Sequence, residues 1–180
     1  KEYTINGLAK ELKESYSFLN RKINQLAKDG VILKRIAGKA ILCSLNLKSD
    51  KTKALLHMVE VEKRDAFVVK NKEIGLILAD FMKKINAVSK NSIKFALIFG
   101  SYVKEQAGLE SDIDIFILAK RKIDLSGIVK ELSAQYGKEI VPIQLSSKEF
   151  NAQRQSEIIK EIIKNHIILT GFENFIECVW

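Results

Sequence analysis

Two aspartates stand two residues apart in an apolar run near the middle of the chain. The run reads "SDIDIFIL" and places Asp112 and Asp114 between isoleucines. Successive side chains of a strand point to opposite faces, so we expect both carboxylates on one face and close together. Neighbouring anions repel each other unless a cation neutralises them, and Mg²⁺ prefers oxygen ligands alongside substrate phosphates. The pair therefore predicts a site for Mg²⁺, or for Mn²⁺ in its place.

A Gly-Ser pair precedes the two aspartates in the sequence. The run "IKFALIFGS" predicts a buried strand that ends at Gly100 and Ser101. The residues that follow, "SYVKEQAG", are expected to begin a helix whose free N–H groups face the strand end. Glycine lets the backbone approach an anion, and a helix N-terminus favours phosphate. The structural alternative is a strand end with exposed acids and a chance Gly-Ser.

The order Gly-Ser, then Asp-x-Asp between apolar residues, resembles the motif of the nucleotidyltransferase superfamily, which includes DNA polymerase beta and the minimal nucleotidyltransferases. The resemblance covers the run "FGSYVKEQAGLESDIDIFI". It implies that Gly100 and Ser101 hold a nucleoside triphosphate. It also implies that Asp112 and Asp114 are catalytic and ligate two metal ions, which align the attacking hydroxyl and the leaving pyrophosphate.

The same family normally supplies a third carboxylate from a later strand, as a metal ligand and as a base. The strand expected at Ile140 to Leu145 contains no Asp or Glu. Gln144 stands where the acid is expected, and an amide cannot act as a base. Glu139 is the other candidate, although its parity puts it on the face opposite Gln144.

The first fifty residues predict a helix, a turn, a second helix and a hairpin. The first helix has Thr4 or Asn6 as a candidate N-cap, and the second, in "SYSFLNRKINQLAKDG", has Ser17 as its cap. The run "VILKRIAGKAILCSL" predicts two short strands around Gly38. This order resembles a winged helix-turn-helix, in which the second helix enters the DNA major groove and the wing touches the backbone or the minor groove.

Polar and basic side chains on the second helix and the wing are the candidate DNA contacts. Residues 1–50 carry ten basic and five acidic residues, which is +5 of the net charge of +8. Cations bind phosphates, while Asn and Arg can address base edges. The alternative is a winged helix that binds protein and has a merely solvated charged face. The candidates are Ser15, Tyr16, Ser17, Asn20, Arg21, Lys22 and Lys39.

The polar stretch "NLKSDKTK" predicts a domain boundary, so that residues 1–50 form the winged helix-turn-helix domain. Residues 51–180 are then expected to form the nucleotidyltransferase-like domain, with a helical linker at 53–89. The expected fold class is α/β (α+β), with a small mixed-sheet nucleotidyltransferase domain preceded by a winged helix-turn-helix domain.

Composition limits the remaining classes of protein. A chain of 180 residues with 47% hydrophobic content can form one large core or two small ones. No apolar run approaches the ~20 residues of a membrane span. Cys43 and Cys178 lack the spacing of a zinc site or a disulfide framework, which indicates a reducing, cytoplasmic compartment. His57 and His166 are interpreted as packing or surface residues.

Two functions are open at this point. In the first, the protein is a Mg²⁺-dependent enzyme that transfers a nucleotide to a protein or nucleic-acid hydroxyl. In the second, it is a DNA-binding transcriptional regulator whose degenerate transferase domain senses a nucleotide or binds a partner. The expected partners are a nucleoside triphosphate and double-stranded DNA, with a protein partner or a second copy of the chain as a further possibility.

Overall fold

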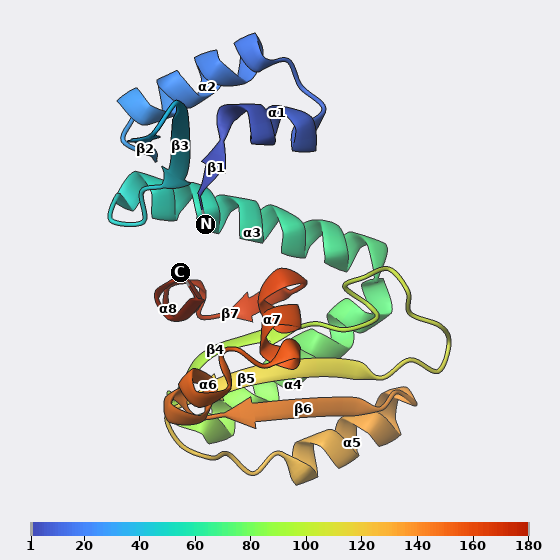
Figure 1. Cartoon of the computed structure of the whole chain (residues 1–180). Helices are drawn as coiled ribbons and strands as arrows, with labels where there is room; N and C mark the ends of the chain where they lie inside the picture. Colours follow the sequence, from blue (N-terminus) through green and yellow to red (C-terminus); the bar gives the residue numbers. More distant parts are fainter. Residues whose placement is uncertain (1, 180) are drawn as a thin grey trace. The chain divides into compact units, whose positions relative to one another are not determined.

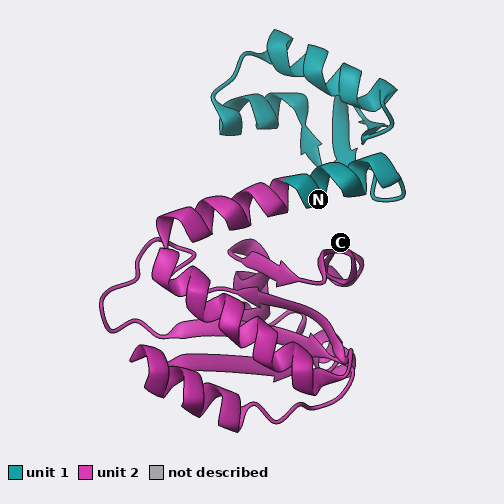
Figure 2. Ribbon diagram, turned by 180° about the vertical axis from the view of Figure 1, so that it is seen from behind, with its two compact units in different colours: residues 1–58 teal, residues 59–180 magenta. Residues whose placement is uncertain are grey.

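The computed structural model describes residues 2–179 and divides into two compact units. Unit 1 ends at Met58 and unit 2 begins at Val59 (Figure 2). The division falls inside one helix, α3 (Asp50–Lys70), which contributes residues to both units. Each unit contains its own sheet and its own buried apolar cluster, as separately folding domains do.

Unit 1 consists of short helices and a three-stranded antiparallel sheet of order β1-β3-β2 (Figure 1). The two helices and the hairpin lie where the sequence predicts them, and strand β1 is an addition. The elements that precede α3 are β1 (Tyr3–Thr4), α1 (Ile5–Leu12), α2 (Tyr16–Lys28), β2 (Ile32–Ala37) and β3 (Ala40–Leu45).

Side-chain hydroxyls begin both of the short helices in unit 1. Thr4 Oγ1 and Ser15 Oγ each accept a backbone N–H from the first helical turn, at 2.9 and 3.3 Å. The prediction that Ser17 caps the second helix is wrong, because the helix begins at Tyr16 and Ser15 has the extended backbone of an N-cap. The helices bury a small cluster of Ile5, Leu19, Ile23 and Cys43.

Unit 2 contains a four-stranded mixed sheet of order β6-β5-β4-β7. Strands β5 and β6 are parallel, and β4 is antiparallel to β5 and to β7, which agrees with the mixed sheet predicted. The elements after α3 are α4 (Lys72–Ser89), β4 (Ile93–Ile98), β5 (Ile113–Ala119), α5 (Ser126–Tyr136), β6 (Ile140–Leu145), α6 (Ser147–Gln153), α7 (Glu157–Lys164), β7 (Ile167–Thr170) and α8 (Phe172–Val179).

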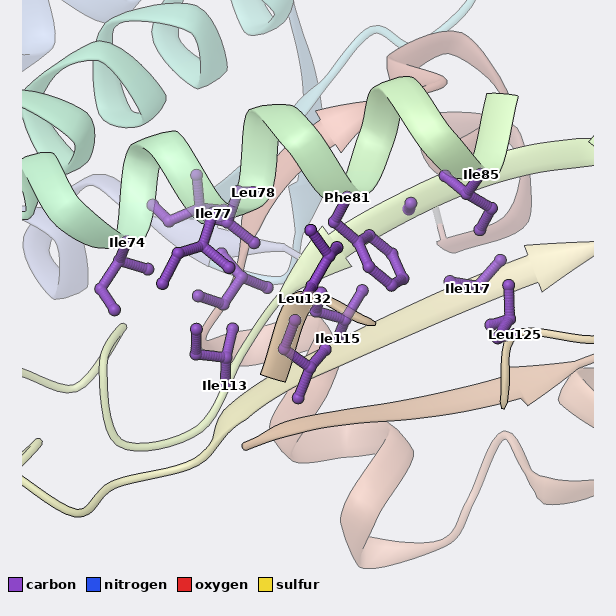
Figure 3. Close-up of a cluster of buried hydrophobic side chains, with 14 of the residues drawn as sticks. Ile74, Ile77, Leu78, Phe81, Ile85, Ile113, Ile115, Ile117, Leu125 and Leu132 are labelled. Carbon is purple, nitrogen blue, oxygen red and sulfur yellow. The ribbon is translucent and has the colours of Figure 1, made fainter. Parts of the chain in front are cut away.

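One face of this sheet packs against α4 and α5 (Figure 3). Ile113, Ile115 and Ile117 alternate along β5 and pack in one cluster with Ile77 and Phe81 of α4, and all five are completely buried. Burying one such side chain stabilises a fold by about 1.5–3 kcal/mol. The alternation predicted for this strand is thus confirmed on its apolar side.

Aromatic rings cover the opposite face of the sheet. Phe116 of β5 contacts Phe95 of β4 and Phe150 of α6, each with ring centroids 5.9 Å apart. Phe95 also meets Phe175 of α8 edge to face, with centroids 5.3 Å apart. The strands are therefore covered on both faces over most of their length, which leaves their ends for chemistry.

The helices differ from the prediction in two places. The helical segment predicted at 53–89 consists of two helices separated at Asn71, whose side-chain amide donates to the Phe67 carbonyl at 3.0 Å. Residues 101–105 form turns, so the helix expected after the first strand is wrong. Beyond Ser146 the chain forms two helices, α6 and α7, because Ser156 caps a new helix by accepting the Ile159 N–H. None of the described helices is long and apolar enough to cross a bilayer.

Candidate functional site

The chain makes a sharp turn at Gly100, two residues after β4 ends. Gly100 has a φ of +77°, which L side chains rarely adopt. A Cβ at this position would lie 2.1 Å from Asp114 Oδ2 and 3.0 Å from Asp114 Cγ. Two features therefore require glycine at this position: the positive φ, and the Asp114 carboxylate that lies where a Cβ would be. The Gly-Ser turn and the second aspartate of the sequence motif are in direct proximity.

The backbone after Gly100 leaves a row of unused donors. Lys104 N–H donates to the Gly100 carbonyl at 3.2 Å, and Gln106 N–H donates to the Ser101 carbonyl at 2.9 Å. The N–H groups of Ser101, Tyr102 and Val103 donate no hydrogen bond to any described residue. Consecutive free N–H groups in a turn of this kind form a concave site for anions. Three free N–H groups thus lie at the strand end where the sequence predicts an anion site, although the helix that was expected to provide them does not form.

Asp112 and Asp114 lie at the start of β5. Asp114 is the second residue of the strand and is half-buried, while Asp112 precedes the strand and is exposed. Burial, and then the neighbouring charge of Asp112, raise the pKa of the Asp114 carboxyl above its usual value. Both effects destabilise the carboxylate form, and a bound cation would relieve both.

The two carboxylates are the candidate ligands of a divalent cation. Among the described residues, no group of three or more His, Cys, Asp or Glu side chains could hold a metal ion. Mg²⁺ is commonly held by one or two carboxylates, with water and substrate phosphates completing its octahedron. Two aspartates beside a row of free N–H groups therefore suit a metal that arrives with a phosphate ligand.

The prediction that Gln144 lies beside the aspartates is wrong. In the parallel β5–β6 pair, Gln144 stands opposite Ile117, which faces the buried side below α4. The Gln144 amide oxygen accepts a hydrogen bond from Ile123 N–H at 3.3 Å. Gln144 thus fastens the connection between β5 and α5, on the other face of the sheet.

Val141 is the residue of β6 that stands beside Asp114. The two are register partners, and paired residues of neighbouring strands point to the same face. Sequence reasoning missed this position because the pattern within one strand does not reveal its alignment with another. Glu139 lies further along this face, where its carbonyl accepts the Ile113 N–H at 2.8 Å, but its side chain is exposed. The position opposite Asp114 is therefore apolar.

Three of the candidate DNA contacts in unit 1 are engaged inside the unit. Ser15 is the N-cap of α2, and Ser17 Oγ lies 3.5 Å from Ser15 Oγ. The side-chain oxygen of Asn20, Oδ1, accepts a hydrogen bond from the side-chain amide nitrogen of Asn24 at 3.3 Å. These polar groups hold the start and one side of α2, and Tyr16 is exposed beside them.

The basic candidates of unit 1 are exposed. Arg21 and Lys22 line a shallow hollow on α2 together with Phe18 and Gln25, with Lys22 Nζ 5.7 Å from the Phe18 ring centroid. Lys39 lies in the turn between β2 and β3. Within the part of the chain that the structure describes, none of these three cations forms an ion pair.

The buried histidine of unit 2 is a packing residue, as interpreted from the sequence. His166 Nδ1 lies 3.0 Å from the Ile163 carbonyl, and its ring centroid is 4.5 Å from that of Phe175. Burial and the positive charge of Lys63 lower the pKa of His166, which keeps the imidazole neutral. His57 is exposed.

Comparison with known proteins agrees with the geometry of unit 2. The family described as "Polymerase beta, Nucleotidyltransferase" matches residues 83–173, just over half of the chain. This range runs from α4 to α8 and contains the Gly100 turn and both aspartates. A protein of Methanocaldococcus jannaschii named "Putative protein adenylyltransferase MJ1305" is 29% identical over 112 residues, which cover 58% of this chain and 76% of the relative.

Two solved structures are similar to part of the chain. A crystal structure described as a toxin-antitoxin with AMP-PNP has 16% identity and a TM-score of 0.42, and covers 57% of this chain and 83% of its own. A crystal structure of a mutant of the toxin-antitoxin MntA-HpeT has 14% identity and a TM-score of 0.40, with the same coverage.

Proposed function

The chain belongs to the polymerase beta nucleotidyltransferase family, and from this premise we propose that it transfers a nucleotide from a nucleoside triphosphate to a hydroxyl acceptor with Mg²⁺ or Mn²⁺. One observation carries the proposal. The Gly100 backbone and the Asp114 carboxylate are so close that a Cβ would lie 2.1 Å from the carboxylate oxygen. A phosphate held at the turn would therefore meet a metal held by the aspartate.

Each candidate residue has a defined role in this proposal. The free N–H groups that follow Gly100, beginning with Ser101, bind the triphosphate. Asp112 and Asp114 hold the metal ion, which neutralises phosphate charge and orients the leaving pyrophosphate when it is bound. The acceptor class is drawn from the M. jannaschii relative, whose name specifies a protein adenylyltransferase. ATP, as the donor of adenylate, and a protein hydroxyl, as its acceptor, are thus the first pair to test.

Turnover is expected to be slow, because no third acid stands beside the pair. Val141 occupies the position opposite Asp114 and cannot remove a proton from the acceptor. Loss of a positioned base typically costs about 10²- to 10⁴-fold in rate. Nucleotide binding does not need that base and is expected to be intact.

The test is transfer of isotope-labelled nucleotide by the full chain, across the four triphosphates, with Mg²⁺ or Mn²⁺ and cell lysate as acceptor. Thermal stabilisation by nucleotide and metal is measured in parallel. Asp112→Asn and Asp114→Asn should abolish transfer and the metal-dependent stabilisation. If both variants keep the stabilisation of the wild type, these aspartates are not part of the site.

A second function is supported by the charge and shape of unit 1. We propose that it is a winged helix that binds duplex DNA, with α2 in the major groove and the β2–β3 hairpin as the wing. The support is the exposed cations of α2, Arg21 and Lys22, with Lys39 at the hairpin turn. The inward hydrogen bonds of Ser15 and Asn20 make phosphate-binding cations more important than base-reading amides in this proposal.

The two functions lead to different results in one pair of experiments. A regulator would bind DNA and nucleotide without turnover, and nucleotide would change its affinity for DNA. An enzyme would turn over, with its DNA affinity unaffected by Asp114→Asn. Fluorescence anisotropy of labelled duplex DNA with the full chain, with and without nucleotide, separates these cases. A protein partner or a second copy of the chain would appear in the same samples by light scattering.

A further inference from the structure

Tyr102 is the buried side chain of the segment that follows the Gly100 turn. It is 8% exposed and packs in the main cluster of unit 2 with Ile98 of β4 and Ile113 of β5. Its neighbours Ser101 and Val103 are only half-buried, and residues 104–110 are exposed. Tyr102 is therefore the deepest anchor of the segment in the core, with Val103 packed less deeply against the same cluster, and it lies among the residues with free N–H groups.

The phenol of Tyr102 reaches across to the other half of the sequence motif. Its hydroxyl donates to the Ser111 carbonyl at 3.2 Å. Ser111 immediately precedes Asp112, and its hydroxyl accepts the Gly108 N–H at 2.8 Å while its own N–H donates to the Gly108 carbonyl at 3.2 Å. This turn, residues 108–111, immediately precedes Asp112. The hydrogen bond from the buried Tyr102 connects it to the core.

Other ties of the segment lie on the surface. Lys104 Nζ is 2.6 Å from Glu161 Oε1, and Glu105 Oε2 is 2.7 Å from Lys70 Nζ. All four side chains are more than a third exposed, so solvent and salt weaken these ion pairs. The Tyr102 hydrogen bond is the tie shielded by burial.

We propose that Tyr102 is a positioning residue of the nucleotide site, which fixes Asp112 relative to the phosphate-binding N–H groups through its hydroxyl. The proposal rests on the proposed transfer function and assigns no contact with substrate to Tyr102. Asp112 stands outside β5, so the strand ladder alone does not hold it. Without the phenolic hydroxyl, the 108–111 turn and Asp112 lose their buried attachment.

The chain offers a matched control for a hydroxyl deletion. Tyr136 of α5 also packs against the same cluster, and its hydroxyl donates to Asp80 Oδ2 of α4. Tyr102→Phe and Tyr136→Phe each remove one hydroxyl and one hydrogen bond from unit 2 and keep the ring. Only Tyr102→Phe removes a hydrogen bond beside Asp112, because the Tyr102 hydroxyl is bonded to Ser111. A role in packing alone predicts the same behaviour for both variants.

The experiment measures the Mg²⁺ concentration needed for nucleotide to stabilise the full chain. The probe is α,β-methylene-ATP, whose α–β bond cannot be cleaved by nucleotide transfer. Loss of an outer-shell partner typically weakens metal binding about 10- to 100-fold. Tyr102→Phe should need at least about 10-fold more Mg²⁺, while Tyr136→Phe should need the wild-type concentration. Ser111→Ala keeps the accepting carbonyl and should show a smaller shift than Tyr102→Phe.

Hydrogen exchange on the ligand-free protein separates failure of this proposal from failure of the proposed function. Tyr102→Phe should speed exchange of the backbone amides at 108–112, and Tyr136→Phe should not. Unchanged exchange there, or an unchanged Mg²⁺ requirement, would overturn the role of Tyr102. A wild type that shows normal exchange protection but no response to α,β-methylene-ATP and Mg²⁺ would overturn the transfer function, and the positioning role with it.

Discussion

The two units differ sharply in how they carry charge. Residues 1–58 contain twelve basic and five acidic residues, a net charge of +7, while residues 59–180 contain eighteen and seventeen, a net charge of +1. A net charge of this size favours a polyanionic partner, through a field that extends over about the Debye length. Unit 2 is nearly neutral and can select a ligand only by the placement of individual groups.

The cores of the two units also differ, in how many residues they bury and how completely they enclose the strands. Unit 1 buries a cluster of four residues between two short helices and a small sheet. Unit 2 buries strands on both faces, with completely enclosed residues along β4 and β5. Two carboxylates held at the end of such strands keep their separation, which a metal site requires. Attraction by charge tolerates a less rigid support, because it depends little on exact position.

The largest expected effect concerns the position opposite Asp114. Val141→Asp places a third carboxylate on the face of the aspartate pair and should raise nucleotide transfer by about 10²- to 10⁴-fold if a base is the missing part. Val141→Asn adds an oxygen ligand without a base and separates the two roles. Labelled-nucleotide transfer measures all three proteins.

Gln144→Asp is the control for this gain. It places an acid on the opposite face of the sheet and removes the hydrogen bond that the Gln144 amide oxygen accepts from Ile123 N–H, so it should lower stability and leave transfer unchanged. A gain from Gln144→Asp without one from Val141→Asp would contradict the register described for β5 and β6.

The next effect tests the core of unit 2. Phe81→Ala removes a completely buried ring from α4 and should lower the free energy of unfolding by about 3–5 kcal/mol. Leu76→Ala on the same helix, where the side chain is 65% exposed, should change it by less than about 0.5 kcal/mol. Urea unfolding followed by circular dichroism gives both values. Equal effects would show that unit 2 is not organised around this cluster.

A smaller effect concerns the cations of unit 1. Arg21→Ala and Lys39→Ala should each weaken duplex binding and reduce the slope of log affinity against log salt by about 1, the value for one phosphate contact. Anisotropy titrations from low to moderate salt measure the slope. Arg35→Ala is a useful contrast, because Arg35 already pairs with Glu2 at 2.6 Å and should change the slope less. Unchanged slopes for Arg21→Ala and Lys39→Ala would exclude α2 and the wing as the DNA surface.

The smallest effect is on the ligand-free stability of unit 2. Burial and Asp112 raise the pKa of Asp114 in the folded state, so folding binds a proton more tightly and stability falls as pH rises through that pKa. At pH 7 this cost is fully present. Asp114→Asn should therefore raise the melting temperature at pH 7 by at most a few degrees. The gain should disappear below about pH 4, where the carboxyl is protonated in both states.

Much of the site could be predicted because β5 carries its own alternation. Apolar residues at 113, 115 and 117 fix which face is buried, and the aspartates at 112 and 114 follow from that parity. Ser146 and Glu149 likewise form a capping box from residues that are only three apart in sequence. The spacing of residues along the sequence is enough to predict an interaction when both groups lie in the same short segment.

The errors arose where distant segments decide the outcome. The position opposite Asp114 depends on how β6 aligns with β5, and the two are separated by α5, so Gln144 was chosen where Val141 stands. The turns after Gly100 form instead of a helix because Tyr102 is drawn into the core and bonds to Ser111, nine residues later. Neither partner can be identified from the segment it affects.

The order of strands in unit 2 has a consequence for how the protein is made. Strand β7 pairs with β4, although roughly seventy residues of chain lie between them. At a ribosomal rate of about 5–20 residues per second, β4 and β5 emerge several seconds before the strand that covers the open edge of β4. During that interval Ala96, Leu97 and Ile98 present an apolar, unpaired edge, which is a template for pairing with another chain. The nascent chain is thus a natural client for chaperones that shield exposed strand edges.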